Sequence, residues 1–396
     1  MSDDTTATRR GLVMLALALG GFAIGVAEFA TMSILPYFSR EFGVTEAAAG
    51  RAISAYALGV CVGAPVIALL GARVSRRGLL VALMAFYALS NAASGLMPGW
   101  GGFTASRFFA GLPHGTYFGV AGLMAASMAP KGKRAQAVSR VMLGLTVSTI
   151  LGVPLANIFG AQLGWRWSFA LVTVLATACA TLVWLYAPKL PTPADASPMR
   201  ELSTLKSRQI WLTLGIGAVG FGGMFCVYTY LASLVMEHAG APESVVPLML
   251  MIFGVGMTAG QFIFGWAADK SLMGSAAVCL VVSAIAMVVF WAVAGNIWLM
   301  APVLLVIGIT GGLSTILQTR LMDLAADAPT LSAALNHSAF NFANALGPWM
   351  GGMALAAGFG WPSVGLVGMG LSLAGLGVWA IAMIDDAPRR RGVVPG

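Results

Sequence analysis

Three ionisable side chains lie within long apolar stretches of this sequence. Arg107 and His114 occur in FTASRFFAGLPHGTYFGV, and Glu28 occurs in GLVMLALALGGFAIGVAEFATMSILPYF. Arg107 and His114 are seven residues apart, close to two helical turns, so both project from one face if the segment is helical. Arginine keeps its proton in proteins, whereas a glutamate or a histidine can exchange one. The three residue types together indicate chemistry based on proton uptake and release.

The composition identifies the elements that hold these residues. Of the 396 residues, 59% are hydrophobic and only 9% are charged, against roughly 25% charged residues in a soluble domain. The mean hydropathy is +0.87. A bilayer span needs roughly 20 apolar residues, and charge-free intervals of that length recur along the chain. The sequence therefore predicts an all-α membrane protein with twelve transmembrane helices.

The predicted spans follow one another with short polar connections. They are 11–38, 52–72, 78–97, 102–128, 141–165, 167–188, 210–236 and 244–268, with two more within 271–319 and two within 328–384. Four cysteines are scattered singly through the spans, so no metal site, cofactor site or disulfide framework is expected. The sequence also offers no signal for nucleic-acid binding.

The basic residues predict the orientation. Short loops rich in Lys and Arg stay in the cytoplasm. With the amino terminus inside, 18 of the 22 Lys and Arg residues fall on the cytoplasmic side, Arg107 lies within a span, and only Arg40, Arg51 and Arg166 fall outside. We therefore expect a multi-pass membrane protein with both termini in the cytoplasm.

The chain has a natural middle and a weak internal repeat. Residues 187–209 form its longest polar stretch, which predicts a six-helix bundle at 1–187, a cytoplasmic linker at 188–209 and a second six-helix bundle at 210–396. Matching residues lie 194 or 196 positions apart: Gly71 and Gly265, Pro154 and Pro348, Trp165 and Trp361. Duplicated halves around a midplane site are typical of secondary transporters.

Four segments carry a more specific resemblance. AEFATMSILP, RFFAGLPHGTYFGV, GLTVSTILGVPLANIFG and FNFANALGPWMGG resemble the major facilitator superfamily, in particular its drug/proton antiporter-type exporters and their arabinose and sugar efflux branch. The resemblance covers nearly the whole chain. It implies two halves that rock around a central site, a small-molecule substrate, protons and membrane lipid as partners, a monomer, and a location in the bacterial inner membrane.

The resemblance also implies gating segments, which the sequence matches in part. They comprise the loop after the second helix, its copy in the second half and the fifth-helix antiporter motif: Gly71, Arg73, Arg76, Arg77, Gly265, Asp269, Gly152 and Pro154. The family usually has an acid where this chain has Ser75, so the gating contact of that acid is not expected in the first half.

Depth along the helices places the three ionisable residues near one another. At 1.5 Å per residue, Glu28 lies ~15 Å from the outer end of its helix, and Arg107 and His114 lie ~10 Å and ~20 Å deep. Intramembrane charges are costly and functional by default. We expect Glu28, Arg107 and His114 to couple transport to protons, with Pro113 permitting local bending. The alternative is a static Glu28–Arg107 pair that fixes packing, with His114 bonded to a backbone carbonyl.

The second half carries a different polar face. A shift of 194 residues places Gly222, Ala301 and Gly308 opposite Glu28, Arg107 and His114, so coupling chemistry is expected in the first half alone. His337, Asn341 and Asn344 instead share one helical face in the second half, with Asn336 beside them. This face predicts a substrate surface for hydroxyls or amides, although helix packing through asparagine is an alternative.

Weaker candidates for substrate contact are spread over both halves: Tyr117, Asn157, Tyr228, Tyr230, Gln261 and Gln318. Together these features predict a proton-coupled exporter of small polar compounds, such as sugars. A multidrug/proton antiporter is the main alternative, followed by a proton-coupled importer and a channel. An enzyme is disfavoured because no nucleophile–base pattern or metal cluster is found.

Overall fold

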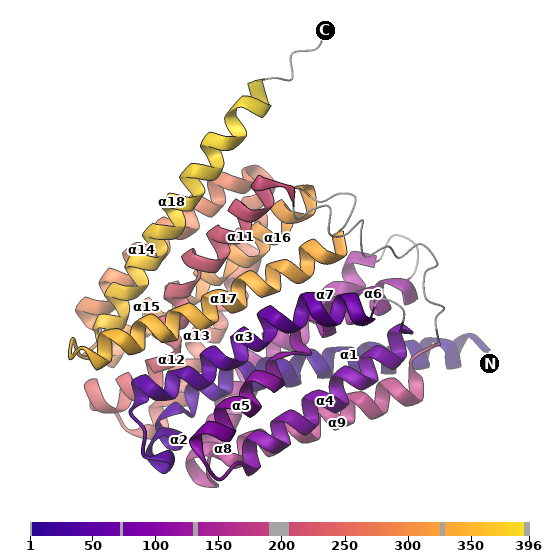
Figure 1. Ribbon diagram of the computed structural model, residues 1–396, viewed down its shortest axis with the longest axis horizontal. Helices are drawn as coiled ribbons and strands as arrows, with labels where there is room; N and C mark the ends of the chain where they lie inside the picture. The colour runs from indigo at the N-terminus through magenta and orange to yellow at the C-terminus, as the bar shows by residue number, and fades with distance from the viewer. Residues whose placement is uncertain (1, 72–73, 130–133, 190–205, 325–328, 392–396) are drawn as a thin grey trace. The chain divides into compact units, whose positions relative to one another are not determined.

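The computed structural model describes residues 2–71, 74–129, 134–189, 206–324 and 329–391, and all regular elements in these ranges are helices (Figure 1). Within them, ten helices are long and apolar enough to cross a membrane. The broken pair α5–α6 and the long α17 complete the expected twelve-helix architecture. Residues 190–205 of the expected linker lie outside the described ranges.

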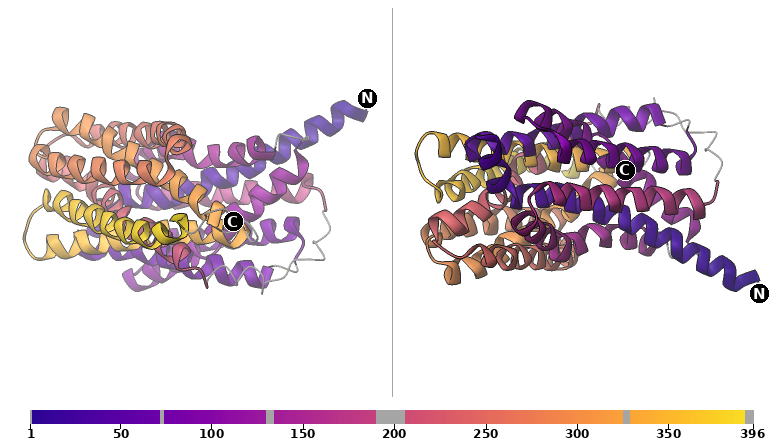
Figure 2. Two further views of the ribbon diagram at one scale, coloured as in Figure 1. Left: turned by 90° about the horizontal axis from the view of Figure 1, so that it is seen from above. Right: turned by 90° about the horizontal axis from the view of Figure 1, so that it is seen from below.

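The described chain divides into two compact units, Met1–Ala196 with Pro242–Met251, and Ser197–Ala241 with Ile252–Gly396. The first begins with α1 (Ser2–Ser33), which packs along α7 and α9 (Figure 2). Its further elements are α2 (Leu35–Phe42), α3 (Glu46–Gly71), α4 (Arg76–Leu96), α5 (Trp100–Gly111), α6 (His114–Met128), α7 (Arg134–Val147), the π-helix η1 (Ser148–Gly152), α8 (Val153–Gln162) and α9 (Arg166–Tyr186).

The second unit holds the remaining helices. They are α11 (Arg208–Gly220), α12 (Gly222–Ser233), the π-helix η3 (Leu234–His238), α14 (Leu272–Val293), α15 (Ile297–Ile309), the 3-10 turn η5 (Thr310–Gly312), α16 (Leu313–Leu324), α17 (Pro329–Ala356) and α18 (Ser363–Arg391). The 3-10 turn η4 (Glu243–Val245) lies in the first unit, and α13 (Val246–Lys270) spans the boundary between the units.

Two predicted helices of the first half are interrupted at proline. The fourth span breaks after Gly111 and resumes at His114, because Pro113 has no N–H to donate and its ring crowds the preceding turn. This confirms the expected interruption. The fifth span, expected as one helix, changes to π geometry at η1 just before Pro154, which occupies the first turn of α8. Such π segments are frequent at functional sites.

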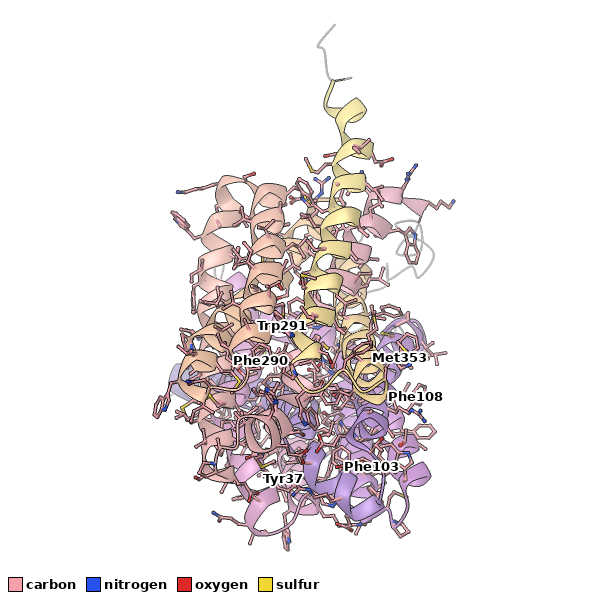
Figure 3. The ribbon with its side chains drawn as sticks, turned by 90° about the vertical axis from the view of Figure 1, so that its left-hand side faces the viewer. Tyr37, Phe103, Phe108, Phe290, Trp291 and Met353 are labelled. Atoms are coloured by element: carbon pink, nitrogen blue, oxygen red, sulfur yellow. The ribbon has the colours of Figure 1, made fainter. Side chains whose placement is uncertain are left out.

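The helices carry large apolar side chains on their outer faces. On α14, Phe290 is fully buried while its neighbour Trp291 is 46% exposed (Figure 3). Leu96, Phe262 and Ile384 are each more than 70% exposed. Exposed apolar surface on this scale is not found in a soluble monomer, and it suits helices that face lipid.

Charged residues at the helix ends pair with one another. Arg166 and the indole of Trp165 both donate hydrogen bonds to Glu41, and Arg320 forms an ion pair of 3.2 Å with Asp386. Partial burial raises the pKa of Glu41, but the bonds from Arg166 and Trp165 outweigh it and leave that pKa below its ordinary value. These pairs tie helices together at their ends.

A seam of glycines joins α3 to the fourth span. A Cβ added at Gly59 or Gly63 would lie 2.1 Å from a backbone oxygen of the fourth span, and one added at Gly111 would lie 2.0 Å from the backbone oxygen of Tyr56. No real Cβ tolerates such distances, so α3 and the fourth span touch backbone to backbone. Small residues at helix contacts allow this approach in membrane proteins.

The second half repeats this seam between α13 and α15–α16. A Cβ added at any of its four glycines would lie 2.1–2.4 Å from a backbone oxygen. These glycines lie 197 residues after Gly59, Gly63, Gly111 and Gly115, and they are Gly256, Gly260, Gly308 and Gly312. Residues in corresponding positions of the two seams are therefore 197 apart in the sequence, and we call this spacing the packing register of these helices. The register of 194 expected from the sequence came from the ends of these helices and from other helices, and it is wrong here by nearly one helical turn.

We expect Gly63→Ala to destabilise the protein, because its methyl group would press on a backbone oxygen that cannot move without its helix. Overpacking of this kind costs about 1–3 kcal/mol. Gly119→Ala on α6 is the matched control, since an added Cβ there meets nothing within 4 Å. Thermal unfolding in detergent should show a lower midpoint for Gly63→Ala and an equal or higher one for Gly119→Ala. Equal midpoints for Gly63→Ala and the parent would contradict the seam.

Candidate functional site

Arg107 lies fully buried on α5, where its guanidinium is fixed from two other helices. Nη1 donates a hydrogen bond to Oδ1 of Asn91 on α4 at 3.1 Å, and Nη2 donates one to the carbonyl oxygen of Ala27 on α1 at 3.1 Å. The planar fork of arginine can reach both acceptors at once. Arg107 is thus a fixed cation rather than a mobile one.

Two aromatic rings enclose the same guanidinium. Its central carbon lies 4.5 Å from the ring centroid of Tyr56 on α3 and 5.2 Å from that of Phe169 on α9. A cation over an aromatic face is attracted by the ring quadrupole, more strongly where water is excluded. These contacts offset part of the cost of holding a charge at membrane depth.

His114 is the first residue of α6 and is also buried. Its Nδ1 lies 3.0 Å from the hydroxyl of Tyr56, which in turn lies 3.0 Å from the hydroxyl of Tyr87 on α4. Tyr87 donates a longer hydrogen bond, of 3.5 Å, to the carbonyl oxygen of Ile24 on α1. A continuous line of polar atoms therefore runs from His114 to the first helix.

Glu28 completes this cluster from α1. It is 7% exposed, it follows Ala27, and it interacts electrostatically with Tyr56, Tyr87 and Arg107. The structure therefore brings the three residues singled out in the sequence into one group of side chains. We call Glu28, Asn91, Arg107, His114 and the two tyrosines Tyr56 and Tyr87 the polar cluster.

Three members of the polar cluster were missed in the sequence. Tyr56, Tyr87 and Asn91 lie in apolar spans, and the last two are four residues apart on one helical face. A polar group at membrane depth is itself a signal. It was overlooked because tyrosine and asparagine carry no charge and do not interrupt a charge-free interval.

The polar cluster combines one permanent charge with two groups that can exchange a proton. Arg107 keeps its charge, Glu28 is neutral when protonated, and His114 is cationic when protonated. Burial strengthens each of these electrostatic interactions relative to water. Protonation of Glu28 would therefore remove the negative charge that offsets the positive charge of Arg107. Proton coupling requires a change of this kind.

Two first-half candidates for substrate contact each donate a hydrogen bond to α1, while Oδ1 of Asn157 is buried and accepts none from the described residues. The hydroxyl of Tyr117 donates to the carbonyl oxygen of Leu17 at 2.7 Å, and the amide nitrogen of Asn157 donates to that of Ser33 at 2.9 Å. These bonds attach α6 and α8 to α1. The structure does not bring either residue into the polar cluster.

The asparagines of α17 are buried in the second half. Asn336 donates to Oε1 of Gln318 at 2.6 Å, which crosses from α17 to α16. Asn341 donates through Nδ2 to the carbonyl oxygen of His337 at 3.0 Å, while its Oδ1 accepts no hydrogen bond from the described residues. Asn344 is fully buried. Asn336 therefore has a packing role, and Asn341 keeps an acceptor for another group.

The other second-half candidates are mostly engaged in packing. Tyr230 donates to the carbonyl oxygen of Pro348 at 2.8 Å, and the ring of Tyr228 lies 4.4 Å from that of Phe253. Gln261 bonds to the hydroxyl groups of Ser314 and Thr315 on α16.

The predicted gating residues lie at helix ends and close contacts. Arg77 donates to the carbonyl oxygen of Trp184 and lies over its ring at 5.1 Å, so it ties α4 to α9. A Cβ at Gly152 would lie 2.5 Å from Val26 of α1. Gly71 ends α3, Arg76 begins α4, Pro154 is the second residue of α8, and Gly265 and Asp269 lie near the end of α13. Arg73 lies outside the described residues.

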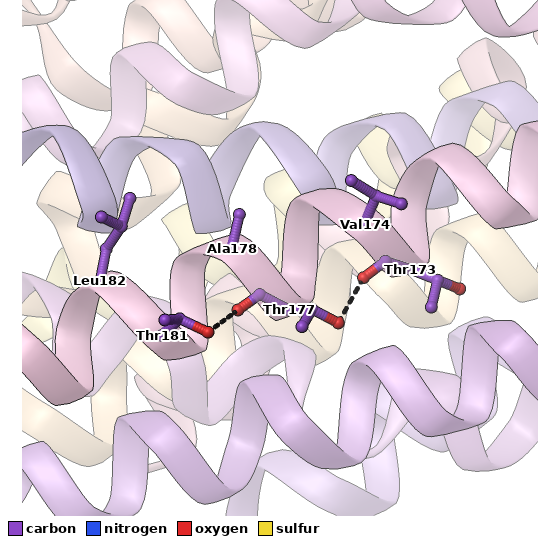
Figure 4. Close-up of a pocket in the computed structure, with 6 residues that line it drawn as sticks. All are labelled: Thr173, Val174, Thr177, Ala178, Thr181 and Leu182. Carbon is purple, nitrogen blue, oxygen red and sulfur yellow. Dashed lines mark hydrogen bonds between the residues drawn. The ribbon is translucent and has the colours of Figure 1, made fainter.

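A shallow groove of about 510 Å³ runs along α9 and is unrelated to the polar cluster (Figure 4). All its lining residues come from this one helix: Thr173, Val174, Thr177, Ala178, Thr181 and Leu182. The threonine hydroxyls donate to carbonyl oxygens four residues earlier at 2.8–2.9 Å. The groove therefore presents a mainly apolar surface, which suits contact with lipid better than with a polar substrate.

Comparison with known proteins agrees with this architecture. The sequence matches the Major Facilitator Superfamily over residues 17–348 and 223–396. It is 37% identical over 371 residues to the inner membrane transport protein YdhP of Escherichia coli (strain K12), covering 93% of this chain and 95% of that protein. It is 28% identical over 368 residues to a probable sugar efflux transporter of Helicobacter pylori (strain G27), covering 91% and 92%.

A solved structure shares the fold. The crystal structure of a D-xylose-proton symporter superposes with a TM-score of 0.71 at 18% identity, covering 93% of this chain and 97% of the other. With a matching family and a relative above 30% identity along nearly its whole length, this chain belongs to the Major Facilitator Superfamily and is a multi-pass transporter of the bacterial inner membrane.

Proposed function

We propose that this transporter is a proton-coupled exporter of small polar compounds, of the sugar or sugar-like class, that works by alternating access of its two halves. It acts as a monomer in contact with lipid, with both termini in the cytoplasm, as the distribution of basic residues indicates. We assign the residues of the three segments named in the sequence analysis to gating: Gly71, Arg73, Arg76, Arg77, Gly265, Asp269, Gly152 and Pro154.

The polar cluster is the observation that carries this proposal. Glu28, Arg107 and His114 are all buried, and Arg107 is held by bonds to Asn91 and Ala27 while its two neighbours can titrate. A purely structural ion pair would need no histidine linked to the same tyrosine ring. In a membrane protein, such a group is expected to mark a proton pathway.

The packing repeat supports placing coupling in the first half. Under the register of 197 found for the fourth span, Arg107 corresponds to Leu304 and His114 to Gly311. The second half thus uses the same helix contacts without the ionisable groups. Polar but uncharged groups remain there, which suits recognition of a neutral substrate.

The substrate class rests on Asn341 and on one relative. The Oδ1 atom of Asn341 is buried and accepts no hydrogen bond from the described residues, so it is available to a hydroxyl donor. We assign His337 and Asn344 of α17, together with Tyr228 of α12, to the same substrate surface as Asn341. Export of sugars, rather than of apolar drugs, also agrees with the printed function of the Helicobacter pylori relative, a probable sugar efflux transporter.

Transport in proteoliposomes tests the proposal. Purified protein should move sugars against their gradient when a pH gradient is imposed, and the flux should stop when a protonophore collapses that gradient. Flux of equal size with and without the pH gradient would indicate a channel or a uniporter and would refute proton coupling. Drug transport without sugar transport would refute the substrate class alone.

A further inference from the structure

The Tyr56 side chain contacts both Arg107 and His114. The guanidinium of Arg107 lies 4.5 Å above its ring centroid, and Nδ1 of His114 lies 3.0 Å from its hydroxyl. Tyr56 itself is 2% exposed and belongs to α3, a helix that carries none of the three residues proposed for coupling. It therefore occupies the junction between the permanent charge and the titratable imidazole.

This junction crosses the break in the fourth span. Arg107 belongs to α5 and His114 to α6, and the two helices are separated by Leu112 and Pro113. Tyr56 is fixed against the last residue of α5, because its backbone oxygen would lie 2.0 Å from a Cβ at Gly111. A bend at Pro113 would move His114 relative to Arg107. Because Tyr56 contacts both residues, its side chain would have to adjust to this movement.

We propose that Tyr56 is a positioning residue that couples the protonation of His114 to the Arg107–Glu28 side of the cluster by reversing a line of hydrogen bonds. This inference rests on the proposed proton coupling. It gives α3 and α4 a role in proton coupling, through Tyr56 and Tyr87. The positions of the buried charges in the sequence do not indicate this role.

The reversal follows from the donors and acceptors present. Neutral His114 with its hydrogen on Nε2 accepts a hydrogen bond at Nδ1 from the Tyr56 hydroxyl. Protonated His114 has hydrogen on both ring nitrogens, so Nδ1 must donate to Tyr56, whose own hydrogen then turns toward Tyr87, 3.0 Å away. The Tyr87 hydroxyl in turn donates to the carbonyl oxygen of Ile24. No covalent bond of either tyrosine is broken in this change.

The line ends one helical turn from Glu28. Ile24 lies four residues before Glu28 in α1, so its carbonyl oxygen occupies the position that accepts the backbone N–H of Glu28 in an α-helix. The titratable and charged groups facing this line are Glu28 of α1, Arg107 of α5 and the two tyrosines. Tyr117 of α6 turns its hydroxyl to Leu17 instead, and α7 carries only Arg134 and Arg140, in its first two turns.

The packing repeat supplies an internal comparison for the hydroxyl. Under the register of 197, Tyr56 corresponds to Phe253, in a helix joined to its neighbour by the same glycine seam. A phenyl ring therefore fits this position of the fold. The hydroxyl is present in the half that carries Arg107 and His114, where it has polar partners.

The test is transport against pH for Tyr56→Phe, which keeps the ring over Arg107 and removes only the hydroxyl. Hydrogen bonds to a charged group are stronger than those between neutral groups. Removing the hydroxyl should therefore destabilise the protonated imidazole of His114 more than the neutral imidazole. We expect the midpoint of the pH profile to shift toward acid by about one pH unit, the size expected for one lost hydrogen bond. Tyr87→Phe keeps the bond between Tyr56 and His114 and should shift the profile less, in the same direction.

Thr116→Val is the matched control. It removes another buried hydroxyl between α6 and α3, which donates to the carbonyl oxygen of Ala64 at 3.3 Å and lies outside the line from His114 to Ile24. Its pH profile should equal that of the parent. The double variant Tyr56→Phe with His114→Gln should show no further shift beyond His114→Gln, because the two residues act through one bond.

The outcomes separate this inference from the proposed function. If the parent protein and Glu28→Gln behave as proton coupling requires but Tyr56→Phe keeps the parent profile, the role of Tyr56 is refuted alone. An equal shift in Thr116→Val, or shifts that add in the double variant, would also refute it. If the parent shows no dependence on the pH gradient, the proposed function fails and this inference fails with it.

Discussion

Glu28→Gln should reduce proton-driven transport to the level of protein-free vesicles, a loss of at least about tenfold, which corresponds to about 1.4 kcal/mol. Glutamine keeps the size and hydrogen-bonding capacity of glutamate but cannot exchange a proton. Glu28 is buried beside Ala27, whose carbonyl oxygen binds Arg107, and it interacts electrostatically with Arg107. Its loss as a titrating group should therefore remove coupling while the helix contacts remain.

Two further measurements separate coupling from folding. Substrate exchange without a pH gradient should persist in Glu28→Gln, since rocking of the halves does not require that residue to stay charged. The matched control is Glu41→Gln, which removes a carboxylate bound by Arg166 and Trp165 on the short helix α2, outside the spans. Glu41→Gln should retain gradient-driven transport. Undiminished gradient-driven transport by a well-folded Glu28→Gln protein would reduce Glu28 to a packing role.

The helices and their buried charges were predictable because the bilayer imposes strong physical constraints. Apolar runs of span length mark the helices, and a charge such as Arg107 is conspicuous within them. Pro113 was also a reliable signal, because a residue without an N–H must interrupt the hydrogen bonds of a helix. These constraints act on single segments, so one sequence is enough to show them.

The contacts between helices were harder to predict. Asn91 and Tyr56 belong to different helices from Arg107, and no local pattern says which faces of α3, α4 and α5 meet. The register of the repeat shows the same limitation. Gly71 and Gly265, near the ends of α3 and α13, are 194 positions apart, whereas the seam glycines Gly59 and Gly256 are 197 apart. Packing, rather than resemblance of loops, determines which residues correspond.

The candidate substrate face shows why residue type alone was insufficient. Asn336 and Asn341 are near neighbours in the sequence, yet the first donates to Gln318 while the second keeps a buried acceptor. Helical spacing places polar groups on a face but does not say which of them another helix will satisfy. The distinction depends on the position of α16, which only the folded chain supplies.

Arg107→Ala should impair transport in a way that depends on pH, with a loss of about tenfold or more near neutral pH. The substitution leaves Glu28 without its neighbouring cation, so the glutamate should bind its proton more tightly and proton release should falter. Raising the pH favours release, and the defect should ease at alkaline pH. Arg107→Lys keeps the charge but cannot reach both Asn91 and Ala27 with a planar fork, so its loss should be smaller.

His114→Gln should behave differently, because glutamine keeps a polar group for Tyr56 but removes the titration of the imidazole. Its pH profile should flatten or shift, while its thermal stability changes little. Transport measured from acid to alkaline pH for Arg107→Ala, Arg107→Lys and His114→Gln therefore distinguishes the two roles. If all three variants lose thermal stability alone, with parental pH profiles and substrate affinity, then Arg107 and His114 only hold the helices together. A defect in Arg107→Ala that persists unchanged at alkaline pH would show that the arginine does more than balance the charge of Glu28.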